Sequence, residues 1–341
     1  MAGVGFVGFG GYVPPTEVTN FDLEGIVDTT DEWIQRRTGI RTRHILAEGE
    51  TILDMAVRAA RLAIEDAGVD PAEIDDIRVG VNTWLRFPSL ATQLQEALGA
   101  PRASAADVAA GCAGFVYAVE QAFHRILVEK ARYGRDTVAL VVGVDGLSHI
   151  TDWTDRQTCV LLGDGAGAVV LRHVEKGGIL ATHTHADGRY GDVLWSDFVV
   201  QGQSNGSPKT FTREAAGPRA YLHMDGRKVF SVAIETMVND VQRVIEKHNE
   251  ASGERIAVED IDYLYPHQAN LRIVEMVAKR LGVGLEKVYT EGVVRYGNTS
   301  TASIPLGYWD NRERYRRGEG RLEIDVAFGA GFASGAILRR S

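Results

Sequence analysis

The chain has 341 residues, a formal net charge of −9 and 45% hydrophobic residues, values typical of a globular protein with two domains or one duplicated fold. The acidic balance argues against a broad surface for nucleic acid or anionic membrane, and no apolar run approaches the ~20 residues of a membrane-spanning helix. Two cysteines, Cys112 and Cys159, exclude a disulfide framework and a cysteine-rich metal site, so we expect no metal and a cytoplasmic location. The amino terminus lacks the basic and apolar regions of a signal peptide.

The first hundred residues alternate between strand and helix patterns. A glycine-containing apolar run opens the chain, and its Gly8–Gly11 part lacks the G-x-G-x-x-G spacing of a dinucleotide loop. Glycines follow several amphipathic stretches, where they end helices. The predicted elements are a strand over 4–13, a short helix from Thr30 or Asp31 to Gly39, a helix over 50–67 ended by Gly68, a strand over 77–81, and a helix over 90–98 ended by Gly99.

The short helix carries Trp33 beside Arg36 and Arg37. An indole ring and guanidinium groups can stack a nucleotide base and hold its phosphates. A packed tryptophan with two solvated arginines explains the same residues. This segment alone leaves both interpretations open.

Cys112 lies in a small-residue run, 107–115, that turns at Gly111 and continues as a predicted helix to about Lys130. The start of a helix favours a thiolate, because unpaired N–H groups and the helix dipole stabilise negative charge. A buried structural cysteine is the alternative. Cys159 lies in an apolar run and is interpreted as a core residue.

Short sequence patterns in the second part of the chain resemble patterns in the first. Residues 163–172 and 329–339 are both glycine-rich turns leading into a strand that ends Gly-Ala, two or three aliphatic residues and Arg, and 262–267 resembles the approach to Cys112. We interpret these echoes as an internal duplication within an α/β fold, with halves 1–175 and 176–341. A near-continuous apolar run, 137–144, predicts a central strand. The long Gly/Ser-rich segment 187–221 is predicted to be a lid or a pocket wall, and a long helix follows it to about Asn249.

Two further polar residues follow predicted strand or loop ends. His267 comes after an apolar strand and Pro266, and Asn298 lies in a loop that leads into a helix. Taken singly, His267 could be a hydrogen-bonded core residue and Asn298 a turn residue. Together with Cys112 they form a set of strand-to-helix positions that can converge at strand carboxyl ends.

At these residues the chain resembles the ketoacyl-acyl-carrier-protein synthase III family, the initiating condensing enzymes of type II fatty acid synthesis within the thiolase-like superfamily. The resemblance extends from Phe6 to Arg339. The most specific run is His267-Gln268-Ala269-Asn270-Leu271-Arg272. The other matching runs are Asp31–Ile34 with Arg37–Ile40, Gly111–Phe115, Asp155-Arg156 with Gly163–Gly167, Tyr296–Ser300 and Phe328–Gly331.

The resemblance implies a five-layered αβαβα fold, a homodimer and a Cys112, His267, Asn298 triad. Cys112 would take an acyl group from acyl-CoA, and malonyl-acyl carrier protein would then lose CO2 and attack the thioester. CoA is then a substrate, and no separate cofactor is expected. The matching positions imply that the backbone N–H groups of Cys112 and Ala330 form the oxyanion hole. They also imply that CoA is bound by Thr29, Trp33, Arg37, Arg156, Gly226 and Asn270, and the carrier protein by Arg272, Lys279 and Arg280. Phe87 matches a position that lies near the acyl pocket in the family, often at the dimer boundary.

The chain departs from the family around the acyl pocket, at 82–88, at Ala330 and in the segment 187–221. These departures leave the primer substrate open. Alternatives are a synthase III-like enzyme of specialised metabolism, which starts a polyketide or transfers an acyl group to another nucleophile, and a catalytically inactive subunit, which the complete triad disfavours. A cysteine protease has no use for the CoA-type residues. A thiolase would need a second active cysteine, absent from 328–331.

Overall fold

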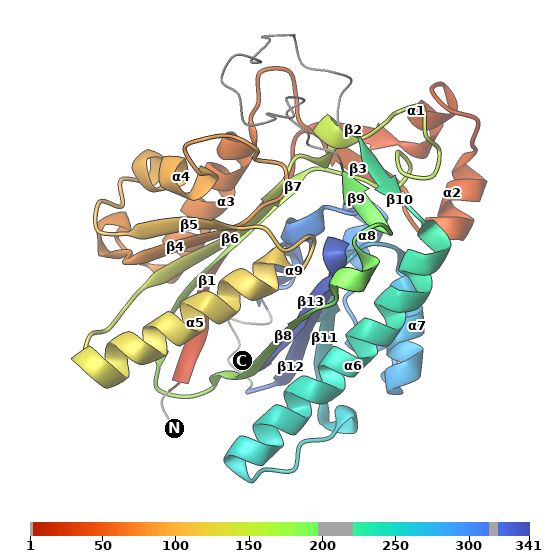
Figure 1. The fold of residues 1–341 in the computed structure, drawn as a ribbon. Helices are drawn as coiled ribbons and strands as arrows, with labels where there is room; N and C mark the ends of the chain where they lie inside the picture. Colours follow the sequence, from red (N-terminus) through yellow and green to blue (C-terminus); the bar gives the residue numbers. More distant parts are fainter. Residues whose placement is uncertain (1–2, 197–220, 314–319) are drawn as a thin grey trace, which may run out of the picture.

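The computed structural model describes residues 3–196, 221–313 and 320–341, and Figure 1 shows their strands and helices. The first half contains β1 (Gly3–Tyr12), β2 (Thr16–Thr19), α1 (Asn20–Glu24), α2 (Asp31–Thr38), β3 (Thr42–Ile45), α3 (Ile52–Ala67), β4 (Asp76–Gly80), α4 (Leu90–Leu98), β5 (Ser104–Val108), α5 (Gly114–Tyr133), β6 (Ala139–Asp145) and β7 (Gly165–Val174). The second contains β8 (Gly178–Ala186), β9 (Leu194–Ser196), β10 (Leu222–Met224), α6 (Gly226–Ser252), β11 (Tyr263–Pro266), α7 (Leu271–Leu281), α8 (Glu291–Tyr296), α9 (Ser303–Asp310), β12 (Leu322–Phe328) and β13 (Ala333–Arg340).

The predicted helix ends near the amino terminus are confirmed. The Thr30 hydroxyl accepts a hydrogen bond from the Trp33 N–H at the start of α2, as an N-cap should. Gly39, Gly68 and Gly99 follow α2, α3 and α4 in the left-handed conformation, which glycine adopts at little cost.

The two large sheets have corresponding strand orders. The first runs β1-β7-β6-β4-β5 and the second β11-β12-β13-β8. In both, an antiparallel hairpin-like pair (β6 with β7, β12 with β13) adjoins one parallel neighbour (β4 or β11) and one antiparallel outer strand (β1 or β8). This correspondence supports the predicted duplication. Residues 175 and 176 lie between β7 and β8, and we propose this point as the division between the halves.

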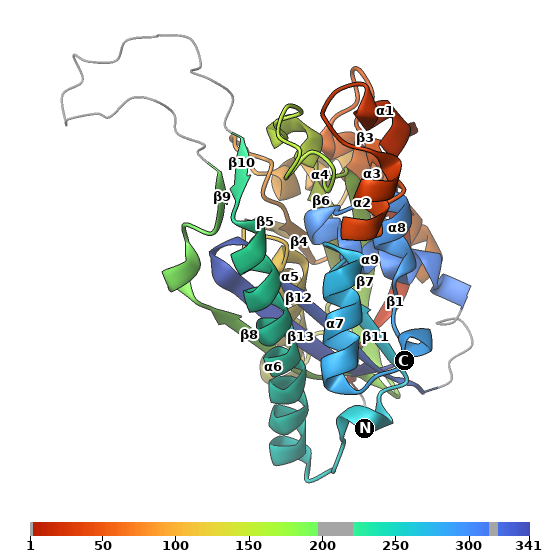
Figure 2. The same ribbon diagram turned by 90° about the vertical axis from the view of Figure 1, so that its right-hand side faces the viewer.

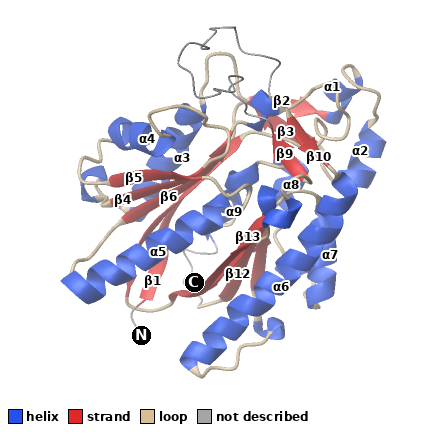
Figure 3. Cartoon of the chain, in the orientation of Figure 1, coloured by secondary structure: helices blue, strands red, loops and turns tan. Residues whose placement is uncertain are grey.

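The layers of the fold form because both faces of each large sheet are apolar and are covered by helices. The strands β6 and β12 are buried along their whole length, as strands covered on both faces must be. Helices α5 and α9 contact strands of both sheets, while α3 and α4 cover the outer face of the first sheet and α6 that of the second, with α7 beside it (Figure 2). Figure 3 shows this alternation of helices and strands. The fold is the five-layered α/β arrangement that the resemblance implied.

Part of the predicted lid or pocket wall, residues 197–220, lies outside the described residues. Its described ends pair as the two-stranded sheet of β9 and β10. No helix in the described ranges has both the length and the apolar character needed to cross a membrane. Those same ranges also hold no group of three or more His, Cys, Asp and Glu side chains arranged to bind a metal ion.

Candidate active site

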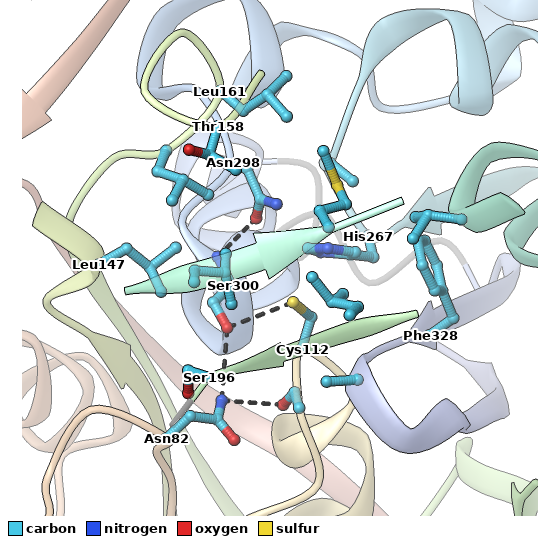
Figure 4. Close-up of a pocket in the computed structure, with 18 of the residues that line it drawn as sticks. Asn82, Cys112, Leu147, Thr158, Leu161, Ser196, His267, Asn298, Ser300 and Phe328 are labelled. Atoms are coloured by element: carbon cyan, nitrogen blue, oxygen red, sulfur yellow. Dashed lines mark hydrogen bonds between the residues drawn. The ribbon is translucent and has the colours of Figure 1, made fainter. Parts of the chain in front are cut away.

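A mainly apolar pocket with a cavity volume of about 310 Å³ lies where the two halves meet (Figure 4). All three residues of the predicted triad line it. The described residues that line it are Asn82, Ala109, Gly111, Cys112, Leu147, Ile150, Thr158, Leu161, Leu162, Leu194, Trp195, Ser196, Leu222, Met224, Gly226, Val229, Phe230, His267, Ala269, Asn270, Ile273, Asn298, Ser300, Phe328 and Ala330. The walls therefore combine a few polar groups with a large aliphatic surface, as small-molecule sites do.

Cys112 follows β5 and a turn at Gly111, whose φ of 53° lies in the left-handed region. A Cβ atom on Gly111 would lie 2.4 Å from the backbone nitrogen of Ala330, so only glycine fits there. The helix α5 begins two residues later at Gly114, whose N–H donates to the Gly111 carbonyl oxygen. The turn thus presents one thiol at the helix start, as the sequence predicts.

The thiol of Cys112 is a poor acid in this setting. Burial raises its pKa to about 12, and the Asp145 carboxylate acts in the same direction, whereas a hydrogen bond from Ser300 lowers it. The Ser300 Oγ lies 3.4 Å from the Cys112 Sγ. By solvent exposure Cys112 is only half-buried, because its side chain faces the pocket. Burial thus opposes the thiolate that the helix start favours.

His267 follows β11, and its backbone N–H extends the parallel pairing by donating to the Val326 carbonyl. Its Nδ1 lies 2.7 Å from the Ser303 Oγ. The Nε2 atom is buried and has no hydrogen-bond partner among the described residues. Burial lowers the pKa of His267 to about 3, so the imidazole is neutral at physiological pH. A neutral ring with one nitrogen held and the other facing the pocket can act on a ligand.

Asn298 lies between α8 and α9, and the neighbouring segment 161–163 holds its backbone. Its N–H donates to the Leu161 carbonyl, and its carbonyl accepts from the Gly163 N–H. The Oδ1 atom of its side chain accepts from the Ser300 backbone N–H at 2.9 Å. Figure 4 shows Cys112, His267 and Asn298 turned toward one common space. The side-chain amide nitrogen of Asn298 is thereby available as a donor there.

The turn at 329–331 passes directly over the Cys112 turn. A Cβ on Gly329 would lie 2.2 Å from the Cys112 backbone nitrogen, so the two backbones are in the closest contact that glycine permits. Ala330 lines the pocket beside Cys112. This contact is compatible with the predicted pair of oxyanion donors, Cys112 N–H and Ala330 N–H.

The predicted CoA-binding residues gather at the start of α2 and across the pocket. The guanidinium carbon of Arg156 lies 4.8 Å from the centre of the Trp33 ring, and that of Arg37 lies 5.9 Å from it. The buried Thr29 Oγ1 has no hydrogen-bond partner among the described residues. Asn270 lines the pocket and donates to the Arg37 carbonyl, which links this group to the pocket. Gly226, at the start of α6, also lines the pocket.

The remaining predicted residues lie outside the pocket. Phe87 does not line the pocket of its own chain: its side chain is 99% exposed. Its acyl-pocket role therefore stays a prediction that requires a second copy of the chain. Arg272, Lys279 and Arg280 are exposed on α7, and the basic face that they would form stays a prediction.

Sequence reasoning missed the polar residues that support the triad. Asn82, Asp145, Ser300 and Ser303 all contact triad residues or one another. The polar residues around Asn298, and an aspartate that ends the apolar strand β6, were visible in the sequence. Nothing in their spacing, however, assigns them to one site.

The comparisons with known proteins agree with this geometry. Residues 106–188 match the family model 3-oxoacyl-(acyl-carrier-protein) synthase III, and residues 252–341 match its C-terminal model. A beta-ketoacyl-(acyl-carrier-protein) synthase III from Cereibacter sphaeroides is 44% identical over 98% of this chain and 97% of that protein. The crystal structure of the synthase III from Aquifex aeolicus superposes with a TM-score of 0.86 at 38% identity, covering 99% of this chain and all of that one. A priming beta-ketosynthase from a polyketide pathway superposes with a TM-score of 0.81 at 34% identity, covering 99% and 96% of the two chains. The chain belongs to the 3-oxoacyl-(acyl-carrier-protein) synthase III family.

Proposed function

We propose that Cys112, His267 and Asn298 carry out the reaction of this family in the chain. The enzyme is a condensing acyltransferase of fatty acid biosynthesis. It joins an acyl-CoA primer to malonyl-acyl carrier protein and so initiates type II synthesis. The observation that supports the residue roles is the arrangement of one thiol, one neutral imidazole and one amide donor around a single apolar pocket.

The first half-reaction loads Cys112. The thiol loses its proton, the sulfur attacks the thioester carbonyl of acyl-CoA, and CoA leaves as a thiol. The backbone N–H groups of Cys112 and Ala330 stabilise the oxyanion that forms at the carbonyl. The aliphatic walls supplied by Leu147, Leu162 and Leu222 suit the acyl chain.

The second half-reaction forms the new carbon–carbon bond. The malonyl thioester loses CO2, and negative charge develops on its carbonyl oxygen. His267 donates from Nε2 and Asn298 from its amide nitrogen, and both hydrogen bonds stabilise that charge. Since His267 is neutral, it donates without protonating the carbanion. The carbanion then attacks acyl-Cys112 and releases the sulfur as a thiolate.

The substrate contacts outside the triad are part of the same proposal. Trp33 and Arg156 hold the adenine, with Thr29 and Arg37 beside them, and Gly226 and Asn270 line the path of the pantetheine arm. The basic face of α7, formed by Arg272, Lys279 and Arg280, attracts the acidic carrier protein and increases the rate of encounter.

We further propose a cytoplasmic homodimer that uses CoA thioester as substrate and needs no other cofactor. Support for the dimer comes from the loop between β4 and α4. Phe87 and Leu85 are large apolar side chains with 99% and 56% exposure, and a second chain would cover them.

The test is mass spectrometry of Cys112 after incubation with a panel of acyl-CoA thioesters, followed by addition of malonyl-acyl carrier protein. Short acyl-CoA should add one acyl group to Cys112, and the carrier protein should then receive it as a 3-oxoacyl product. Cys112→Ala should remove both. An unmodified Cys112, or unchanged turnover in Cys112→Ala, would contradict the proposal.

A second candidate is priming in specialised metabolism, which the similarity to a polyketide priming ketosynthase supports. The same panel separates the two candidates. Preferential loading of an unusual acyl unit, with short straight-chain primers left unreacted, would favour this second role.

A further inference from the structure

We propose that Ser300 stabilises the thiolate of Cys112 as a hydrogen-bond donor, and that Asn82 and Asp145 fix the direction of that donation. The inference deepens the proposed function and rests on it. None of these three residues belongs to the predicted triad, yet they connect a buried carboxylate to the sulfur atom.

Asp145 determines how the neighbouring donors are oriented. It is completely buried at the end of β6. Its Oδ1 accepts from the backbone N–H of Asn82 and Thr83 and from the Thr83 hydroxyl, at 2.8 to 3.0 Å. Its Oδ2 accepts from the Thr301 hydroxyl at 3.0 Å and from the Asn82 side chain at 3.1 Å. A carboxylate is only an acceptor, so Asn82 must turn its NH2 group toward it.

A second acceptor fixes the same orientation of Asn82. Its Nδ2 lies 3.1 Å from the carbonyl oxygen of Gly111. That carbonyl belongs to the same peptide plane as the Cys112 N–H, one of the proposed oxyanion donors. Asn82 therefore also orients that N–H through the peptide bond.

The remaining contact of the Asn82 NH2 group is with Ser300, whose Oγ lies 3.4 Å away. The two hydrogens of that NH2 group are directed to the two acceptors at 3.1 Å, and an NH2 group cannot accept. The Ser300 hydroxyl hydrogen therefore points away from Asn82 and toward the Cys112 Sγ, which lies 3.4 Å from the Ser300 oxygen. Asp145 thus accepts from Asn82, the Asn82 NH2 group faces the Ser300 oxygen, and the Ser300 hydroxyl donates to the sulfur. Such a donor favours the anion over the thiol.

The backbone conformation and the burial of Ser300 support a specific role for this residue at the site. Its φ of 52° makes it the only non-glycine residue with positive φ among the described residues, and its side chain is buried. Its N–H holds the Asn298 Oδ1. One residue in an unfavourable conformation thereby contacts two members of the triad, and strained positions of this kind concentrate at functional sites.

The donor matters twice in the proposed reaction. Cys112 must become an anion to attack acyl-CoA, and it leaves as an anion when the carbanion takes the acyl group. Burial disfavours that anion in both steps, and no Lys or Arg side chain lines the pocket within residues 3–196, 221–313 and 320–341. Ser300 is the hydroxyl that compensates for this burial at the sulfur.

The experiment measures the rate at which iodoacetamide alkylates Cys112 across a range of pH, in the full-length wild type, Ser300→Ala and Ser300→Gly. Both variants should lower the rate about tenfold or more at pH 8 and move the profile to higher pH by about one unit. Asn82→Ala should move it in the same direction by less. Glycine relieves the positive φ whereas alanine keeps it, so equal shifts in the two variants assign the effect to the hydroxyl.

Decarboxylation of malonyl-acyl carrier protein without a primer supplies the second readout. The Ser300 variants keep the N–H that holds Asn298, so decarboxylation should fall much less than alkylation. Ser303→Ala is the reciprocal control, because its hydroxyl contacts His267: decarboxylation should fall and the alkylation profile should keep its midpoint. An unchanged profile in both Ser300 variants overturns the proposal, and so does an equal fall of both readouts with a lowered Tm. Alkylation needs no CoA substrate. A failure of this proposal can therefore be distinguished from a failure of the proposed condensation reaction.

Discussion

The Nδ1 atom of His267 lies 2.7 Å from the hydroxyl oxygen of Ser303, while the Nε2 atom of the same ring is buried with no hydrogen-bond partner among the described residues. A serine that donates to Nδ1 selects the tautomer with its hydrogen on Nε2. The proposed mechanism needs that hydrogen to stabilise the enolate of the malonyl thioester. Ser303 is therefore a positioning residue for His267.

Replacing Ser303 by alanine should lower malonyl decarboxylation about tenfold, because the ring loses its fixed tautomer and a buried nitrogen loses its partner, at a cost of about 1 to 3 kcal/mol. Acylation of Cys112 by acyl-CoA should remain close to that of the wild type, since His267 acts in the second half-reaction. Single-turnover assays of the two half-reactions measure this difference. Equal losses in both would contradict the assignment.

The pH dependence of stability should carry a contribution from His267. Burial lowers its pKa from 6.5 to about 3 in the folded protein. Below pH 6.5 the unfolded chain binds a proton that the folded chain does not, so the free energy of unfolding falls as the pH falls toward 3. The contribution reaches about 2 kcal/mol at pH 5 and is absent above pH 7.

His267→Gln should remove this contribution. Urea unfolding of both proteins at pH 7.5 and pH 5 measures it, because the other titrating groups are common to the two and cancel in the difference. The wild type should lose about 2 kcal/mol more than the variant on acidification. Parallel losses would show that His267 is protonated in the folded state.

Gly111→Ala should destabilise the protein by roughly 3 kcal/mol or more, because the new Cβ would lie 2.4 Å from the Ala330 nitrogen and φ is 53°. Gly68→Ala is the matched control: Gly68 has a φ of 62° but no atom within 4 Å of its added Cβ. It should cost only the left-handed penalty of about 1 to 2 kcal/mol. Thermal unfolding of both variants separates the clash from the conformational cost, and equal losses would contradict the close backbone contact.

Arg156→Ala should raise the KM for acyl-CoA by about tenfold and change kcat little, because stacking over Trp33 contributes to binding and not to the chemical step. An acyl-pantetheine thioester, which lacks the adenine, should react equally well with the variant and the wild type. Arg36→Ala is the control, because Arg36 is exposed on α2, the helix that carries Trp33, and should change neither KM. If the KM for acyl-pantetheine rose as much as the KM for acyl-CoA, the assignment of Arg156 to the adenine site would be wrong.

The basic face of α7 should affect only the carrier-protein substrate. The double variant Lys279→Glu with Arg280→Glu should raise the KM for malonyl-acyl carrier protein several-fold at low salt, and the difference should shrink as salt screens the charges. The KM for acyl-CoA should stay unchanged. Arg132→Glu, an exposed charge reversal on α5, serves as a control. An equal effect of Arg132→Glu would attribute the result to net charge.

The sequence alone was sufficient to predict the elements that depend on local interactions. Helix stops at Gly39, Gly68 and Gly99 were predictable because glycine alone adopts the left-handed cap at little cost. The buried strand at β6 followed from its continuous apolar run. The five-layered fold, which the structure confirms, followed from the family resemblance, because specific runs such as 267–272 match residue by residue. The roles of the triad and of the CoA-binding set rest on the same resemblance and stay predictions.

The tertiary structure decided what depends on distant contacts. The surroundings of a cysteine at a helix start affect its ionisation, and the walls of the pocket raise the Cys112 pKa by burial although the helix start favours the anion. Phe87 has the residue type expected beside an acyl pocket, yet its loop turns it away from the pocket of its own chain. Asn82, Asp145 and Ser300 come from three segments more than 60 residues apart in sequence. Only the fold brings them together, because hydrogen-bond direction is set by which donors and acceptors become neighbours.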